Sequence, residues 1–293
     1  MRRFLMKRKL FIFLFLALVV LSPLQARIRA KGYLFIIGGG HRSKAMMKRF
    51  LELRGMSPYG KIVIFPMASS QPEESGQSMK EEFNSLGIHE VEYHVLSREQ
   101  ALKEENAKIL DNVNCIYFTG GDQSRLTAAL VSTPIHQRLL KIFKQGGIIG
   151  GTSAGAAVMS EIMITGDEKR NVEDGHAFEK ILSDNIVVTP GFGFIKKAII
   201  DQHFVARKRH NRLLSLVAEH PELLGIGIDE STAIVVKPDD TFEVIGEQNV
   251  VIYDATKAKI HSMPSHTVSG FHIIMHVLKP GDQFDLKTKN PIE

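Results

Sequence analysis

Residues 146–160 read GGIIGGTSAGAAVMS, and a lone serine stands between glycines directly after a short apolar run. The run Ile148-Ile149 is typical of a buried strand, and the small residues after Ser153 are typical of a tightly packed helix start. Glycines two positions before and after Ser153 give the pattern G-x-S-x-G, in which a sharp strand-to-helix turn lifts the hydroxyl to the sheet edge. The stretch therefore predicts a sheet flanked by helices and a candidate nucleophile at Ser153. A small-residue helix start without chemistry is the competing interpretation.

The rest of the first 150 residues alternates between short apolar runs and amphipathic segments. Apolar runs predict buried strands within residues 32–40, 61–69, 91–96, 115–121 and 146–151. Helical spacing lies between them, at residues 43–54, 74–87, 98–111 and 133–146. This alternation predicts an α/β fold with a mostly parallel sheet and helices on both faces. Binding sites in such sheets form at the carboxyl ends of the strands. Glycine groups stand at three of these ends, at 38–40, 120–121 and 150–151.

After about residue 222 the sequence changes to β-rich segments separated by turns. We expect these segments to extend the sheet and to pack a smaller layer. No linker, repeat or low-complexity tract follows the first 26 residues, so the simplest interpretation of residues 27–293 is one domain with a β-rich C-terminal extension.

The first 26 residues have the pattern of a signal peptide. Five basic residues and no acidic residue accompany the apolar run 10–21, and Leu24 and Ala26 stand where a signal peptidase reads. Twelve apolar residues are few for a membrane span, which favours a cleaved signal over an uncleaved anchor. We expect the mature protein to be secreted or periplasmic, with no membrane attachment once the signal is removed.

The net charge of +5 resides in that leader. The chain has 37 Lys and Arg against 32 Asp and Glu, and five of the basic residues lie in the first 26. The mature chain is therefore balanced, and its charge gives no indication of a nucleic-acid partner. The single cysteine, Cys115, lies in an apolar run and is expected to be a small buried side chain. We expect no metal and no other cofactor.

A serine nucleophile needs a general base, and His203 is the candidate because of its neighbours. In AIIDQHFVARKRHNRLL (residues 198–214) an apolar run ends at His203, and a segment with three arginines follows, which we expect to be helical. A histidine at the end of a strand can reach the end of a neighbouring strand. From the residues alone, a structural histidine and a solvated arginine face are equally good interpretations.

A carboxylate should orient this histidine. The candidates between the serine and the histidine are Glu161, Asp167, Glu168, Glu173 and Asp174. Glu168 is the first choice and Glu173 the second, because both lie in a polar, loop-like segment that follows an apolar run. Each of them could equally be a surface charge.

Three further turns carry polar residues or glycines. In GGDQSRL (120–126) the amide of Gly121 is a candidate oxyanion donor together with the amide of Ala154, and Gln123 can bind a substrate carboxylate or amide. An ordinary turn that caps the next helix is the alternative. In GIDEST (227–232) we expect Asp229 and Glu230 either to meet a cationic group or to cap a turn. GGGHRSK (38–44) lacks the spacing of a phosphate-binding loop and predicts a tight strand-to-helix turn near the site.

Together these segments resemble the peptidase E / cyanophycinase family of serine hydrolases. The resemblance runs from about residue 32 to 287 and is carried by GGDQSRL, GTSAGAAVMS, DQHFVARKRHNRLL, GIDESTAIVV and VLKPGDQFDL. It implies a fold like that of class I glutamine amidotransferases, a homodimer, and no metal. The implied activity is hydrolysis of cyanophycin, a poly-aspartate with arginine on each β-carboxyl, to β-aspartyl-arginine dipeptides.

The resemblance also implies roles for individual residues. Ser153 is the nucleophile and His203 the base, and the substrate site is lined by Gln123, Asp201, Gln202, Arg207, Arg209 and Arg212. A polymer of carboxylates and guanidinium groups fits a cleft with both arginines and carboxylates. The chain departs from the family at Gly40-His41-Arg42 and in a longer segment between Ser153 and His203. A peptidase for short aspartyl or isoaspartyl peptides, or a non-catalytic binding protein on the same fold, therefore stays open.

Overall fold

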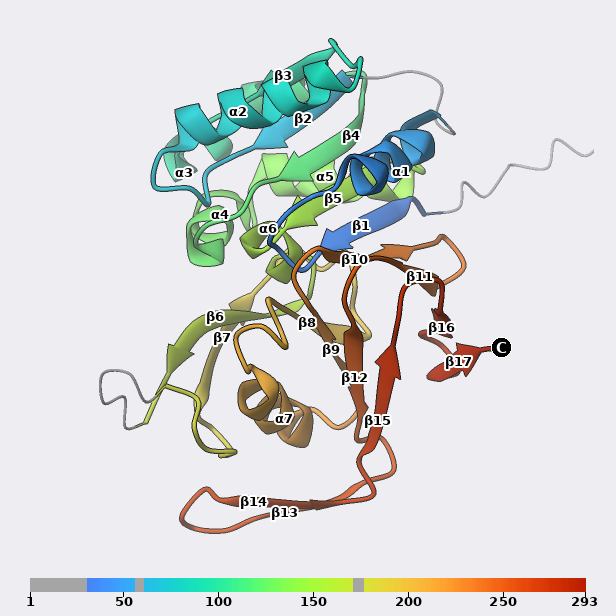
Figure 1. Cartoon of the computed structure of the whole chain (residues 1–293). Coiled ribbons are helices and arrows are strands. Elements are labelled where there is room, and N and C mark those ends of the chain that lie inside the picture. Colours follow the sequence, from blue (N-terminus) through green and yellow to red (C-terminus); the bar gives the residue numbers. More distant parts are fainter. Residues whose placement is uncertain (1–30, 56–60, 171–176) are drawn as a thin grey trace, which may run out of the picture.

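The computed structural model describes residues 31–55, 61–170 and 177–293 (Figure 1). The expected signal peptide, residues 1–26, lies outside this part of the chain. A sheet of nine strands is the largest feature, with the order β17-β16-β11-β10-β1-β5-β4-β2-β3. Within the described ranges, no helix is both long and apolar enough to cross a membrane.

Five strands form the parallel side of this sheet, as the alternating pattern predicts. They are β1 (Tyr33–Ile37), β2 (Lys61–Phe65), β3 (Val91–Tyr93), β4 (Val113–Phe118) and β5 (Ile148–Thr152). Four of them are almost entirely buried, with Cys115 inside β4, which explains their near-continuous apolar sequences, whereas the edge strand β3 is partly exposed. Their carboxyl ends all lie at one edge, where the three glycine groups are found.

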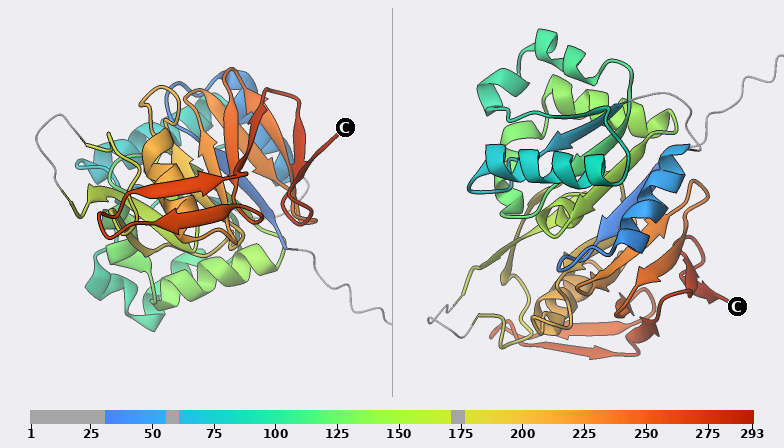
Figure 2. Two further views of the ribbon diagram at one scale, coloured as in Figure 1. Left: turned by 90° about the horizontal axis from the view of Figure 1, so that it is seen from below. Right: turned by 45° about the horizontal axis from the view of Figure 1, so that its top comes forward.

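Helices cover both faces of the parallel side (Figures 1 and 2). One apolar core lies between the sheet and two helices, α1 (Lys44–Gly55) and α2 (Pro72–Ser85). A second core lies on the opposite face, under α4 (Gln123–Leu130), α5 (Pro134–Lys144) and α6 (Ala154–Ala157). The start of α5 shows the local cause: Thr133 caps it by accepting from the His136 amide, and Pro134 occupies its first turn.

The segment expected to be one helix at 98–111 is divided into α3 (Arg98–Ala101) and the 3₁₀ helix η1 (Glu104–Leu110). A capping box between Ser97 and Gln100 starts α3. The side chain of Asn106 then donates to the carbonyl of Gln100 at 2.8 Å, and so competes for the carbonyl that a continuing helix would use.

The remaining strands of the large sheet run antiparallel and come from the C-terminal region. They are β10 (Thr232–Val236), β11 (Thr241–Gly246), β16 (Gln283–Asp285) and β17 (Asn290–Ile292). Because β10 pairs with β1, the predicted β-rich extension of the sheet is confirmed.

A second sheet of four strands provides the smaller layer, in the order β15-β12-β9-β8. It contains β8 (Ala198–Gln202), β9 (Leu224–Ile228), β12 (Val250–Asp254) and β15 (Ile274–Leu278), and only β8 and β9 are parallel. Helix α7 (His210–Glu219) covers one face of it. The chain passes from β9 to β10 through residues 229–231, so this short connection joins the two sheets.

Two hairpins complete the fold. One is formed by β6 (Ile162–Glu168) and β7 (Ile186–Pro190), and the other by β13 (Lys259–Ser262) and β14 (Val268–Phe271). The β6–β7 hairpin reaches away from the large sheet, and β13–β14 crosses the far end of the smaller layer (Figures 1 and 2). Neither hairpin was expected from the sequence.

Candidate active site

Ser153 occupies the sharp turn that G-x-S-x-G predicts. Strand β5 ends at Thr152 and α6 begins at Ala154, and the serine between them has φ 54° and ψ −111°, an unfavourable conformation for a residue with a side chain. A Cβ on Gly151 would overlap the carbonyl of Gly155, and a Cβ on Gly155 would overlap the carbonyl of Phe118. Both flanking glycines are therefore required by the close approach of the backbone.

A hydrogen-bonded chain of three side chains begins at this serine. Ser153 Oγ lies 2.8 Å from His203 Nε2, and His203 Nδ1 lies 2.5 Å from Glu230 Oε1. Ser153 follows a strand of the large sheet, His203 follows β8 of the small sheet, and Glu230 lies on the connection between the two. The site thus forms where the two sheets meet. The arrangement is that of a nucleophile, a general base and a carboxylate that orients the base.

The end of β1 ties these three segments together through its backbone. Carbonyls of three successive residues accept from one segment each: Ile37 from the Ser153 amide, Gly38 from the His203 amide and Gly39 from the Ser231 amide, at 3.0, 2.7 and 2.8 Å. A single short segment therefore sets the relative positions of all three catalytic candidates. We call residues 37–40 the β1 end.

The glycines of the β1 end leave room for the catalytic side chains. A Cβ on Gly39, which has φ +112°, would overlap the imidazole ring of His203. A Cβ on Gly40 would lie 2.8 Å from the Cβ of Glu230. The turn predicted near the site at residues 38–44 is therefore present, and its glycines are explained by direct contact with the histidine and the glutamate.

The expectation that Glu168 orients His203 is corrected by these contacts. Glu168 lies at the end of β6, where its carboxylate accepts from the Phe178 amide at 2.9 Å and from Asn185 Nδ2 at 2.6 Å. The second choice, Glu173, lies outside the described residues. The partner of the histidine is Glu230, which follows it in the chain, whereas the predicted candidates all lie between Ser153 and His203. One signal for it was present: the acidic pair Asp229-Glu230 directly follows the apolar strand β9.

Burial lowers the pKa of His203 below its ordinary value, the Glu230 hydrogen bond raises it, and the positive charge of Arg207 lowers it. Burial is the largest of these effects. The lowered pKa favours the neutral imidazole, which is the state that can accept a proton from the serine.

A cleft of about 1000 Å³ opens beside Ser153. Of the residues predicted to bind substrate, five line this cleft: Gln123, Gln202, Arg207, Arg209 and Arg212. Segment 177–179 and residues of the β6–β7 hairpin form another wall. Basic side chains from 207–212 outnumber the acidic side chains of Asp122 and Glu179, so the cleft suits a substrate that carries carboxylates.

Asp201 does not line the cleft as expected but lies beneath it. It is 1% exposed, and it holds the buried guanidinium of Arg212 by two hydrogen bonds. The same carboxylate lies 3.8 Å from Arg209, whose pKa is lowered to about 10, first by burial and next by Arg212. Asp201 thus compensates the positive charges of Arg209 and Arg212, which we call the cationic floor of the cleft.

The two glutamines of the cleft differ in what they leave free. Gln123 Nε2 donates to the carbonyls of Ile164 and Thr165 at 2.9 and 2.5 Å, so its amide nitrogen holds β6. Gln202 Oε1 is buried and has no hydrogen-bond partner within the described part of the chain. A buried acceptor without a partner is costly, and a donor from a bound substrate would satisfy it.

The two candidate oxyanion donors lie next to the serine. Ala154 is the residue after it and begins α6, and Gly121 lines the cleft. The neighbouring Gly120 is so close that a Cβ there would lie 3.3 Å from the Cβ of Ser153. This placement is compatible with both amides facing an oxygen bound at Ser153.

The family model of peptidase family S51 matches residues 34–245, which span the serine, the histidine and the glutamate. The chain belongs to peptidase family S51. As an S51 peptidase it is a hydrolase of the serine type, as the sequence resemblance predicts.

Curated relatives of this S51 peptidase carry the name cyanophycinase. The chain is 34% identical to the one from Geminocystis herdmanii, over 88% of this chain and 94% of the relative. It is 33% identical to the one from Trichormus variabilis, over 87% and 86% of the two chains. The crystal structure of a peptidase from an acI-B1 actinobacterium superposes with a TM-score of 0.62 at 24% identity, over 88% of this chain and 98% of that one, and shows that the fold is shared.

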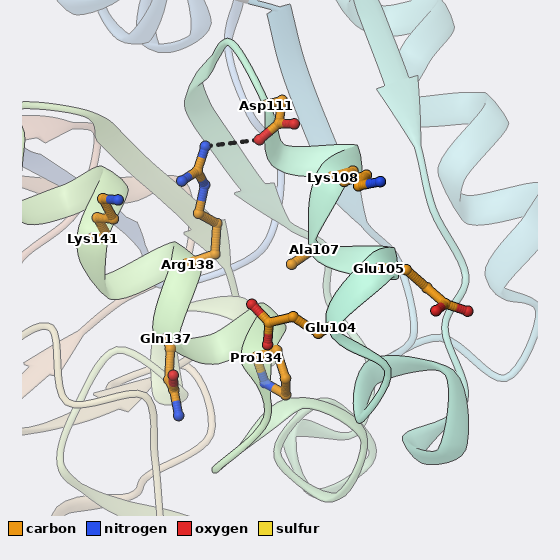
Figure 3. Close-up of a pocket in the computed structure, with 9 residues that line it drawn as sticks. All are labelled: Glu104, Glu105, Ala107, Lys108, Asp111, Pro134, Gln137, Arg138 and Lys141. Atoms are coloured by element: carbon orange, nitrogen blue, oxygen red, sulfur yellow. Dashed lines mark hydrogen bonds and ion pairs between the residues drawn. The ribbon is translucent and has the colours of Figure 1, made fainter.

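A further cavity, of about 510 Å³, lies away from the catalytic side chains of this S51 peptidase (Figure 3). It is lined by residues of η1 and α5 and carries charges of both signs, with Arg138 bound to Asp111 at 2.9 Å. Within the described ranges, no group of three or more His, Cys, Asp and Glu side chains could hold a metal ion, either in this cavity or elsewhere.

Proposed function

We propose that this S51 peptidase hydrolyses cyanophycin and releases β-aspartyl-arginine dipeptides. The observation that carries the proposal is the chain of contacts from Ser153 through His203 to Glu230 at the mouth of a cationic cleft. The names of the curated relatives support the choice of substrate.

The proposed reaction is nucleophilic acyl transfer. Ser153 Oγ attacks the scissile carbonyl while His203 Nε2 takes the hydroxyl proton. Glu230 accepts the Nδ1–H bond, holds the ring in the required tautomer and stabilises the imidazolium that forms. The amides of Ala154 and Gly121 bind the oxyanion of the tetrahedral intermediate.

Collapse of this intermediate breaks the C–N bond, and His203 returns its proton to the leaving amine. Water then attacks the acyl-enzyme with His203 again as base, and the products are a free carboxylic acid and the restored serine. Each step uses groups of this chain and one water molecule.

The cleft supports a substrate of repeated aspartyl and arginyl groups. The α-carboxylates of the polymer's arginyl groups can pair with the guanidinium groups of Arg207 and Arg209, and the carboxylates of Asp122 and Glu179 can meet the arginyl guanidinium groups. The proposal includes hydrolysis from an end of the polymer, in which each cleaved backbone peptide bond releases one aspartyl residue with its arginine.

Secretion or periplasmic export is part of the proposal, and its support is the leader pattern of residues 1–26. The mature chain, residues 27–293, would then act on polymer outside the cytoplasm as a single hydrolase domain.

We also propose that the protein is a homodimer, as the family resemblance implies, and that β15 contributes to the contact. This edge strand belongs to the run FHIIMHV (271–277), in which Phe271, Ile274, Met275 and Val277 are 46–57% exposed. The run has no charged residue to blunt the edge. Antiparallel pairing with the same strand of a second copy would set Met275 opposite Val277 and place no like charges together.

Sedimentation tests this proposed dimer. It should give a dimer for the wild type and a monomer for Met275→Lys, and a wild-type monomer would refute the proposed homodimer.

Incubation of the mature protein with insoluble cyanophycin tests the function, with Ser153→Ala as the control. We expect the wild type to release β-aspartyl-arginine, identified by mass. We expect the variant to lose about 10⁶-fold in kcat, because the nucleophile is gone. Cleavage of short aspartyl or isoaspartyl peptides alone would move the substrate to that class. Unchanged activity of Ser153→Ala would contradict the mechanism.

A further inference from the structure

Glu168 has no contact with the catalytic side chains, yet it is held in a defined position close to the cleft. We propose that Glu168 is a positioning residue that fixes the wall of the substrate cleft formed by residues 177–179. We call this segment the cleft wall. The inference rests on the proposed function, because it assigns to this wall a part in substrate binding.

The carboxylate of Glu168 is fixed from the β7 side of its hairpin. Asn185 is completely buried and donates to Glu168 Oε1 at 2.6 Å. Its own Oδ1 accepts from the Arg170 amide at 3.1 Å, and its carbonyl accepts from the Lys169 amide at 2.6 Å. Asn185 therefore links the end of β6 to the start of β7 and orients the Glu168 carboxylate.

The second oxygen of Glu168 accepts the backbone amide of Phe178 at 2.9 Å. Phe178 has φ +62°, a left-handed conformation that a bulky residue adopts only when its surroundings impose it. Its carbonyl accepts from Asn211 Nδ2 at 3.0 Å, and so does the carbonyl of Glu179. The strained residue is thus held on one side by Glu168 and on the other by Asn211.

The Phe178 ring is placed against the cationic floor of the cleft. The guanidinium of Arg212 lies 5.2 Å from the centre of the ring, and Arg212 is bound to Asp201. Residues 177–179, Asn211 and Arg212 all line the same cleft as Ser153. A continuous series of contacts therefore leads from Glu168 to the substrate side of the cleft.

This series does not pass through the catalytic chain, since Glu230 is the carboxylate bound to His203. Loss of Glu168 should therefore weaken substrate binding and leave the chemical step intact. Glu168→Ala removes hydrogen bonds to a charged carboxylate, which are stronger than those between neutral groups. We therefore expect this variant to raise KM roughly tenfold to a hundredfold. We expect kcat to stay within about twofold.

The conservative variant refines the test. Glu168→Gln keeps an oxygen for the Phe178 amide but loses the acceptor for Asn185, so its KM should lie between those of the wild type and Glu168→Ala. Glu161→Ala is the matched control, because Glu161 is an exposed glutamate just before the same hairpin and pairs only weakly with Lys196 at 3.4 Å. Its KM should equal that of the wild type. A loss of kcat without a change in KM, in either Glu168 variant, would overturn the proposal.

A readout without substrate separates this inference from the proposed function. Hydrogen–deuterium exchange of residues 177–183 should be faster in Glu168→Ala than in the wild type, because the Phe178 amide loses its acceptor. Exchange in Glu168→Gln should lie between the two, because an oxygen remains for this amide while the contact with Asn185 is lost. Exchange of residues 153–159 should not change. If the wild type cleaves no cyanophycin but this difference is present, the function fails and the positioning role stands. Unchanged exchange in residues 177–183 overturns the role whatever the substrate.

Discussion

The β1 end and the cleft wall border the same site, but they are held in different ways. The β1 end uses three backbone carbonyls to fix the segments of Ser153, His203 and Glu230, and its glycines touch the catalytic side chains directly. The cleft wall is held by side chains, mainly Glu168 and Asn211. Tightly packed backbone contacts fix the positions of the catalytic candidates. Side-chain contacts fix the cleft wall, so single substitutions can change the surface that meets the substrate.

The comparison predicts that one added methyl group at the β1 end is severe. Gly39→Ala should lower kcat about a hundredfold, because its Cβ must displace the His203 ring and a shift of about 1 Å in a catalytic group has that effect. KM should change much less, since the cleft wall is not touched. Steady-state kinetics measure both values.

Gly87→Ala is the matched control for this variant. Gly87 also has a left-handed backbone, with φ +87°, but no atom lies within 4 Å of the position of its Cβ. Gly87→Ala should lose about 1 kcal/mol of unfolding free energy from the strained backbone. Gly39→Ala should lose more, because its Cβ also overlaps the His203 ring, and only Gly39→Ala should lose kcat. Equal kcat values for the two variants would mean that the β1 end does not determine the position of the His203 ring.

A smaller effect is expected at Arg207, whose guanidinium lies 4.0 Å from Glu230 on the open side of the site. The positive charge lowers the pKa of His203, so Arg207→Gln should raise that pKa toward its ordinary value. The base acts when neutral, so reactivity rises with pH through this pKa, and the acid limb should move to higher pH in the variant. The plateau at high pH should not change.

The pH dependence is measured with an uncharged covalent serine probe, because Arg207 also lines the cleft and its loss would weaken substrate binding. Lys141→Gln, on the cavity of Figure 3, removes a positive charge far from the histidine. Its acid limb should coincide with that of the wild type. A limb that moves to lower pH in Arg207→Gln would show that the electrostatic account has the wrong sign.

Local patterns explain how much of the molecule could be predicted. Strands that are buried on both faces have short apolar sequences, and this is sufficient to place β1, β2, β4 and β5. The glycines around Ser153 were sufficient to recognise its turn. His203 was recognisable because it directly follows an apolar strand, β8. These elements depend on neighbours within a few residues.

The features that were missed depend on contacts between distant segments. Glu230 becomes the partner of His203 only because β9 lies in one sheet and β10 in the other, so that their connection passes the histidine. Chain order says nothing about that crossing. Glu168 looked suitable because it is acidic and follows an apolar run, but its hairpin directs it to Phe178 and Asn185.

The central claim is that Glu230 acts on catalysis through His203, and a double-variant comparison of kcat tests it most directly. Glu230→Gln alone should lower kcat about 10⁴-fold, because the ring loses its orienting carboxylate. His203→Ala should lower it further, and the double variant should be no slower than His203→Ala, since residues that act as a unit are not additive. A double variant slowed by the product of the two single effects, or a Glu230→Gln enzyme with the kcat of the wild type, would contradict the account.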